Sequence, residues 1–242
     1  MKLYNLKIFV LILSLSFSFF TKADTSENLC LDDKDKYFNN FSINIMPKKI
    51  SIEIEKNKKW QKENLKILLS SGTIKKEYKK RYSANVKVLF QNNITCIFRA
   101  KVRKHGDFKD HIELRDGNII QSLDIHLKNG HINGITKFKL LLPKTRGNPD
   151  DEIILTELFR SLNIMAPRTF YVKVDNQSIN SKMLFQEKAS KEFLEFNKRK
   201  ESVILEGDER YLYDDDLNHF TDTAYLFSLS KITNKKLLNK NK

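Results

Sequence analysis

The stretch NITCIFRAKV, residues 93–102, alternates between apolar and polar side chains. Its apolar positions are Ile94, Cys96, Phe98, Ala100 and Val102, and Thr95, Arg99 and Lys101 stand between them. Successive side chains of a β-strand point to opposite faces, so this period of two predicts a strand with one buried face. The stretch therefore predicts a sheet that packs against a hydrophobic core.

Strand-like segments lie on both sides of this stretch in the sequence. They are residues 86–90, 123–127, 138–142, 169–174 and 183–185. Residues 91–93, 129–130 and 175–176 lie between or after these segments and consist mostly of Asn, Asp and Gly, which favour tight turns. The order of strands and turns indicates a sheet built largely from hairpins, and such a sheet is mostly antiparallel.

Two helices are predicted among these strands. Asn148 followed by Pro149 and three acidic residues is a strong signal for a helix start. The apolar side chains that follow share one face, which we expect to pack on the sheet, and they are Ile154, Leu155, Leu158, Phe159 and Leu162. A second helix is expected over residues 187–200. The predicted fold class is therefore α+β, with a mostly antiparallel sheet, one packed helix and a helical C-terminal segment.

The composition is that of a globular and strongly basic protein. Among the 242 residues 40% are hydrophobic and 11% are aromatic, which excludes general disorder and favours one domain with appendages. The 44 Lys and Arg residues exceed the 30 Asp and Glu residues, so the formal net charge is +14 at pH 7. This charge favours anionic partners without naming one. The two cysteines exclude a disulfide-dense scaffold and a four-cysteine zinc site.

Residues 1–23 have the parts of a secretory signal peptide. Lys2 and Lys7 precede an apolar and small-residue run over residues 8–20, and Thr21 and Ala23 are small residues at the positions that a signal peptidase requires. The run is shorter than the ~20 residues that span a bilayer, and an uncleaved membrane anchor is the alternative. We therefore expect an exported protein, periplasmic or extracellular, without a transmembrane span after signal cleavage.

Residues 24–83 are predicted to form a polar and basic lead-in. Residues 24–49 are polar and rich in Asn, and residues 50–82 are the most basic stretch, with a partly helical pattern. The stretch ends in a cluster of cations and aromatic rings, formed by Lys75, Lys76, Tyr78, Lys79, Lys80, Arg81 and Tyr82. Such a cluster resembles a polyanion-binding patch, and a solvated basic face is the alternative interpretation.

Cys30 and Cys96 are the only thiols of the chain. In an oxidising compartment two thiols pair if the fold brings their Cα atoms within ~7 Å. A disulfide between Cys30 and Cys96 is therefore one prediction. A buried free Cys96 on the apolar side of its strand is the other.

Four blocks of sequence, in this order and spacing, are similar to the N-terminal part of the CotH kinase family, exported proteins whose fold resembles an atypical protein kinase. The blocks are FRAKVRKHGDFKDHI at 98–112, SLDIHLKNGHINGITKFKLLL at 122–142, DDEIILTELFRSLNIMAPRTFYVKV at 150–174 and MLFQE at 183–187. The resemblance covers residues 84–206, which we expect to form a domain resembling the N-terminal lobe of a protein kinase.

The resemblance implies a site for ATP and Mg²⁺ formed by Arg103, Gly106, Asp107, Lys137, Lys139, Glu157 and Glu187. Gly106 and Asp107 would lie in the loop that approaches the phosphates, and Glu157 would take the place of the kinase glutamate that pairs with a phosphate-contacting lysine. Glu187 would border the adenine. Each residue also has a structural interpretation, in which Glu157 belongs to an exposed helix face and the two lysines point outward from a strand.

The chain departs from the family pattern at two places. His105 stands where the family usually has Arg, with Arg103 two residues earlier, and Ser-Leu-Asp at 122–124 stands where family members commonly show Lys. The segment HGDFKDH, residues 105–111, offers two histidines and two carboxylates to a metal ion. The alternative, which we favour, is that Asp110 and His111 bond to neighbouring backbone.

Two functions follow from these features. The first is an ATP-dependent protein phosphotransferase domain that we expect to be incomplete, because the residues after the hinge at Glu187, which end in the acidic then basic segment 207–242, are too few for a catalytic lobe. This segment contains Asp214, Asp215 and Asp216, which could hold a metal ion but are more often solvated. The second is a non-enzymatic periplasmic or secreted binding module, whose basic surface binds anionic surface polymers, lipids or proteins. The sequence leaves enzymatic activity open and indicates no specific nucleic-acid partner.

Overall fold

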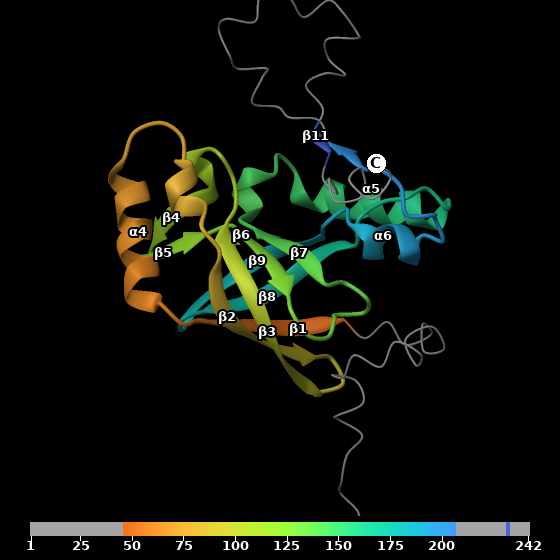
Figure 1. Ribbon diagram of the computed structural model, residues 1–242, viewed down its shortest axis with the longest axis horizontal. Coiled ribbons are helices and arrows are strands. Elements are labelled where there is room, and N and C mark those ends of the chain that lie inside the picture. The colour runs from red at the N-terminus through yellow and green to blue at the C-terminus, as the bar shows by residue number, and fades with distance from the viewer. Residues whose placement is uncertain (1–45, 207–230, 233–242) are drawn as a thin grey trace, which may run out of the picture.

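Seven strands close into a barrel in the computed structural model of the chain (Figure 1). The structure describes residues 46–206 and 231–232. Around the barrel the strands follow the order β1 (Pro47–Ile54), β2 (Tyr82–Phe90), β3 (Thr95–Lys104), β6 (Leu123–Leu127), β7 (Lys137–Leu141), β9 (Ile179–Glu187) and β8 (Thr169–Asn176). The prediction of an α+β fold with a mainly antiparallel sheet is confirmed, and the sheet is a closed and mixed barrel.

The barrel interior is filled by alternate side chains of each strand. On β3 these are Cys96, Phe98, Ala100 and Val102, the residues that the period of two places on one face. At the other side of the interior, the ring of Phe185 stacks on Phe138 and Phe170, with centroids 4.6 and 4.5 Å away. These large buried rings dominate the energetics of the core. Because the apolar side chains fill the interior, the polar side chains of the same strands form the outer surface.

β1 closes the barrel, and it lies within the segment that the sequence analysis assigned to a lead-in. It pairs antiparallel with β2 and parallel with β8, so it joins the two ends of the sheet. Its interior residues are Ile50, Ile52 and Ile54, which alternate with Ser51 and Glu53. The folded part therefore begins well before residue 84, because a strand with this alternating pattern supplies the last wall of the barrel.

A helix and a small hairpin cover one end of the barrel. These are α4 (Asn57–Leu69), β4 (Ile112–Arg115) and β5 (Asn118–Gln121), with the short turns η2 (Lys76–Lys79), η3 (Lys109–His111) and η4 (Pro143–Thr145) nearby. Trp60 of α4 is fully buried, and Lys104 at the end of β3 places its Nζ 3.8 Å from the centre of the Trp60 ring. Burial lowers the pKa of Lys104, and its ion pair with Glu63 at 3.0 Å opposes that effect. This contact fixes α4 to the barrel.

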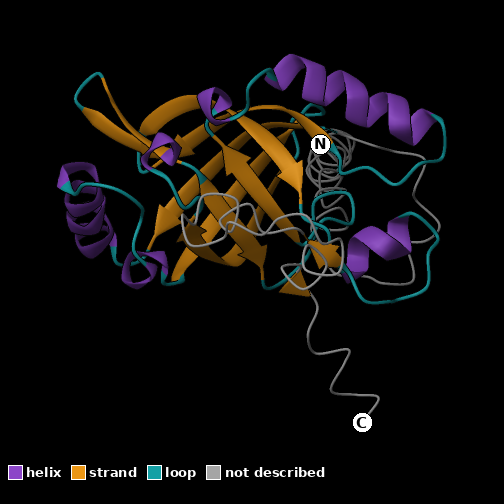
Figure 2. Cartoon of the chain, turned by 90° about the horizontal axis from the view of Figure 1, so that it is seen from above, coloured by secondary structure: helices purple, strands orange, loops and turns teal. Residues whose placement is uncertain are grey.

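α5 (Pro149–Ser161) begins as predicted but is oriented differently. The side chain of Asn148 caps the helix by accepting a hydrogen bond from the N–H of Asp151. The apolar stripe over residues 154–162 points to solvent, and no residue of α5 is buried. Figure 2 shows α5 running along the outside of one end of the barrel. The prediction that this helix packs on the sheet through its apolar face is therefore wrong.

The last elements are short. α6 (Lys191–Phe196) replaces the helix predicted over 187–200, because Glu187 belongs to β9. β10 (Leu205–Glu206) pairs antiparallel with β11 (Lys231–Ile232). The predicted signal peptide and most of the segment 207–242 lie outside the described residues. Within residues 46–206 and 231–232, none of the helices has the length and apolar character needed to cross a membrane.

Candidate functional site

The outward side chains of neighbouring strands form a basic surface, which we call the basic face. It consists of Lys101 and Arg103 on β3, Lys137 and Lys139 on β7, Arg81 just before β2 and Lys188 just after β9. The strand register brings these residues together, because Arg103, Asp124 and Lys139 are cross-strand partners, and so are Lys101, His126 and Lys137. Directly opposite residues have Cβ atoms ~5 Å apart. Two rows of mostly cationic side chains therefore run across β3, β6 and β7.

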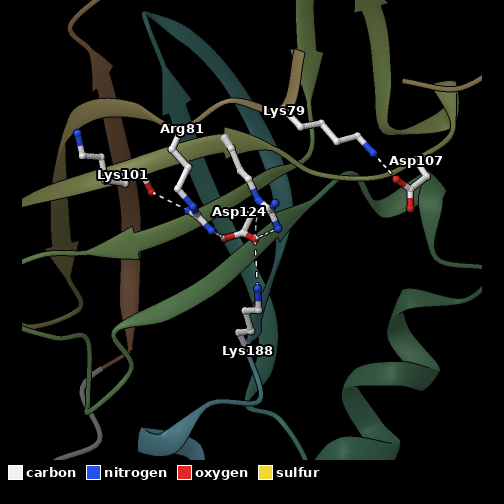
Figure 3. A network of polar contacts seen from close by, with 7 residues as sticks. Lys79, Arg81, Lys101, Asp107, Asp124 and Lys188 are labelled. Carbon is white, nitrogen blue, oxygen red and sulfur yellow. Dashed lines mark hydrogen bonds and ion pairs between the residues drawn. The ribbon is translucent and has the colours of Figure 1, made fainter. Parts of the chain in front are cut away.

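Asp124 lies at the centre of the basic face (Figure 3). Its carboxylate accepts hydrogen bonds from Nε and Nη2 of Arg103 at 3.0 and 2.7 Å. It also accepts from Nη2 of Arg81 at 3.2 Å and from Nζ of Lys188 at 3.3 Å. The side chain of Asp124 is 2% exposed, whereas its partners are 27–36% exposed. One buried carboxylate thus fixes the positions of three partly exposed cations.

The positive charge of the basic face lowers the pKa values of titratable groups within it. Burial alone would raise the pKa of Asp124, but the charges of Lys188, Arg103 and Arg81 lower it to about 2. Burial, followed by the charges of neighbouring lysines, lowers the pKa of His126 to about 4 and that of His105 to about 3. Both imidazoles are therefore neutral at pH 7, and the Lys and Arg side chains carry the positive charge.

The second row holds cations with few neutralising acids. Lys101 donates to the hydroxyl of Ser83 at 2.7 Å, and Lys137 pairs with Glu192 at 3.6 Å. His126, which is neutral at pH 7, stands between Lys101 and Lys137, so β6 supplies this row with no carboxylate of the kind that Asp124 supplies to the first row. A surface on which cations outnumber acids suggests a ligand of opposite charge.

Three of the residues implied by the CotH resemblance lie together on this face. They are Arg103, Lys137 and Lys139, on β3 and β7, which flank β6 on its two sides. The strand alternation predicted that the two lysines point outward, and the structure places them so. The other four residues make contacts within the chain, and their place in a nucleotide site stays a prediction.

Gly106 and Asp107 are explained by contacts within the chain. Gly106 has a φ of 94°, and an added Cβ would overlap the ring of His111. Asp107 forms an ion pair with Lys79. The glycine is thus required by the close approach of an imidazole ring, and a phosphate is not needed to account for it.

Glu157 and Glu187 each pair with an arginine. Glu157 is exposed on α5 and pairs with Arg160 on the same helix, and Lys137 pairs with Glu192. Glu187 is buried at the end of β9 and accepts hydrogen bonds from Nε and Nη2 of Arg168 at 2.8 and 2.7 Å. α5 packs beside β8, and the role of Glu157 at a nucleotide site stays a prediction.

Two hollows lie away from the basic face. One, of about 660 Å³, is lined by polar residues outside β1, including Lys49, Asn57 and Asp175. The other, of about 250 Å³, lies between α5 and the barrel. Gly106 lines neither hollow. In the described part of the chain, no three His, Cys, Asp or Glu residues are grouped to hold a metal ion, which includes the segment 105–111.

Two further predictions, a disulfide and a metal site, involve residues outside the described part of the chain. Cys96 is buried in the barrel and is disulfide-bonded, and the other cysteine of the chain, Cys30, lies outside the described residues. The acidic run 214–216 also lies outside them. A metal site at that run therefore stays a prediction.

A scan against protein-family models and a search of curated proteins find no match. The resemblance to the CotH kinase family therefore stays a prediction, and the functional proposals below depend on the geometry of the site.

The sequence alone did not reveal Asp124 as the centre of a site. The alternation of Leu123, Ile125 and Leu127 with Asp124 and His126 indicates that Asp124 points outward. Its contact with Lys188, 64 residues later in the chain, depends on the order of strands around the barrel. The outward direction could be predicted, and the convergence of the cations could not.

Proposed function

We propose that this chain is an exported, non-enzymatic binding module that binds anionic surface polymers through the basic face. The observation that carries the proposal is the arrangement of Lys and Arg side chains in two cross-strand rows around the buried carboxylate of Asp124. The net charge of +14 adds a long-range attraction for any polyanion.

A polymer with repeated charges fits this surface better than a single small anion does. Within a row the two cations lie on β3 and β7, two strand spacings or ~10 Å apart, and along each strand the two cations are two residues or ~7 Å apart. Repeated anionic groups of an extended polymer can therefore meet several of these side chains. Asp124 holds Arg81, Arg103 and Lys188 in place before binding. Side chains that are already ordered lose less entropy when a ligand binds. Binding that depends on partly exposed charges weakens as salt is added.

The test is the binding of fluorescently labelled polyphosphate to the full chain at several salt concentrations. The double variant Lys101→Gln, Lys137→Gln removes two charges of the basic face without touching the contacts of Asp124. We expect an affinity about tenfold lower, because each exposed charge pair contributes ~0.2–1 kcal/mol.

The matched control is Lys58→Gln, Lys59→Gln, which removes the same charge from exposed positions on α4. The control is expected to bind as the wild type does, within about twofold, because surface substitutions away from a site change little. An equal loss of affinity in both double variants would contradict the proposal, since binding would then follow net charge alone.

The alternative function is an ATP-dependent protein phosphotransferase that uses Mg²⁺. Its support is the CotH resemblance together with the juxtaposition of Arg103, Lys137 and Lys139 on one face. It predicts saturable binding of ATP that requires Mg²⁺ and raises the Tm of the full chain. A Tm that does not change with excess MgATP would contradict this alternative and leave the polymer-binding proposal unaffected.

A further inference from the structure

The apolar stripe of α5 is turned away from the barrel. It consists of Ile154, Leu155, Leu158, Phe159 and Leu162, which are 42–64% exposed. The opposite side of the helix, with Ile153, Glu157 and Arg160, faces the hollow between α5 and the barrel. Helices in proteins are stabilised mainly by burying an apolar face. A stripe of five large apolar side chains that each stay about half exposed therefore indicates a missing cover.

The stripe is too large to be an ordinary surface feature. Ile164 and Met165, which follow the helix in the chain, are exposed as well, and monomeric proteins seldom expose large apolar patches. The first turn of α5, next to the stripe, carries the exposed acids Asp150 and Asp151. A second copy of the chain placed on the stripe would bring these acids near their own copies, and like charges repel. The cover is expected to be apolar and without acidic groups.

We propose that residues 37–45 of the same chain cover the stripe. Their sequence, YFNNFSINI, has no charged residue and contains five apolar or aromatic side chains, and it lies outside the described residues. The next residue, Met46, lines the hollow beside α5 together with Ile153 and Arg160. Its carbonyl accepts a hydrogen bond from the N–H of Gln91 at 3.1 Å. The chain therefore enters the barrel directly beside the helix.

The segment is long enough for this role. Nine extended residues span up to ~30 Å. The 13 residues of α5 form a helix ~20 Å long and ~10 Å across. This length is sufficient for a segment that starts at Met46 to pass around α5 and to run along the stripe. In the extended conformation Phe41, Ile43 and Ile45 point to one side, which matches a one-sided apolar surface.

Photo-crosslinking of the full chain tests the proposal directly. The variant Leu158→p-benzoylphenylalanine places a crosslinker in the middle of the stripe. After irradiation, we expect mass spectrometry of the digested monomer to find the adduct on residues 37–45. The same crosslinker at Leu69, which is 76% exposed on α4, is the control and should not label that segment. Adducts on residues 207–242, adducts between two copies, or no adduct at all would each overturn the proposal.

A second measurement does not require the crosslinker. The variant Phe41→Asp introduces a charge into the proposed contact, and Asn40→Asp introduces the same charge at the neighbouring residue. We expect the amide hydrogens of α5 to exchange faster in Phe41→Asp than in Asn40→Asp, because loss of the cover allows the helix to open locally. Equal exchange of α5 in the two variants would contradict the proposal. Neither experiment involves anion binding, so both are independent of the function proposed for the basic face.

Discussion

Replacing Asp124 by Asn removes the negative charge that holds the cations of the basic face together. The amide has nearly the same shape as the carboxylate, and its oxygen still accepts hydrogen bonds, so the substitution isolates the charge. Burial alone would raise the pKa of Asp124, yet the charges of Lys188, Arg103 and Arg81 lower it from 3.8 to about 2. The variant loses the stability that this lowered pKa represents.

The magnitude follows from the two pKa values. A carboxyl group with a pKa of 3.8 in the unfolded chain and about 2 in the folded chain contributes about 2 kcal/mol to the free energy of unfolding near pH 6. Because the folded value is the lower one, the contribution is complete above the unfolded pKa and is lost as the pH falls through the folded pKa. About 1 kcal/mol remains at pH 3. We therefore expect Asp124→Asn to lower the free energy of unfolding by these amounts.

Urea unfolding at pH 6 and pH 3, followed by the fluorescence of the single tryptophan, measures the effect. Trp60 is fully buried in the wild type, so its emission reports unfolding. The control is Asp116→Asn, at an exposed position in the turn between β4 and β5, where we expect a change of less than ~0.5 kcal/mol. A loss for Asp124→Asn that is the same at both pH values, or no larger than that of the control, would refute the reasoning.

Three further perturbations test other parts of the structure. Gly106→Ala places a methyl group against the imidazole ring of His111 and should lower the free energy of unfolding by ~2–3 kcal/mol. The control Gly117→Ala has open space around the added carbon and should lower it by ~1 kcal/mol. Equal urea midpoints for the two variants would contradict this expectation. Glu187→Gln leaves the buried Arg168 without its anion and should lower the free energy of unfolding by ~3 kcal/mol or more, as measured by thermal unfolding. The exposed control Glu157→Gln should lower it by less than ~1 kcal/mol. Burial lowers the pKa of His105 to about 3, so its contribution to the free energy of unfolding is complete above pH ~6.5 and declines as the pH falls. The variant His105→Asn should reduce this decline by up to ~1.4 kcal/mol per pH unit. Parallel curves of unfolding free energy against pH for the variant and the wild type would exclude this role.

Local signals in the sequence predicted the local structure well. The alternation along residues 93–102 identified the interior side chains of β3, because the period of a strand is set by its backbone alone. The cap at Asn148 identified the start of α5 for a similar reason, since a cap depends only on the next three residues. The outward direction of Lys137 and Lys139 followed from the same alternation.

The parts that depend on distant pairing could not be predicted in this way. Closure of the barrel requires β1 to pair with β8, which brings residue 50 beside residue 174. No local pattern in the sequence around β1 indicates that β8 is its partner. The amphipathic pattern of α5 shows which side chains share a face, but it does not show what that face touches. The network of Asp124 depends on the same long-range order, because Arg81, Arg103 and Lys188 come from three separate segments.

The most direct test of anion binding by the basic face is a nuclear magnetic resonance map of the full chain during titration with polyphosphate. We predict that the amide shifts concentrate on β3, β6 and β7, at positions that include Lys101, His126 and Lys137, and that high salt reverses them. Shifts centred on the polar hollow beside β1, around Lys49 and Asn57, or spread evenly over all lysine-rich segments, would contradict the assignment of this surface as the binding site.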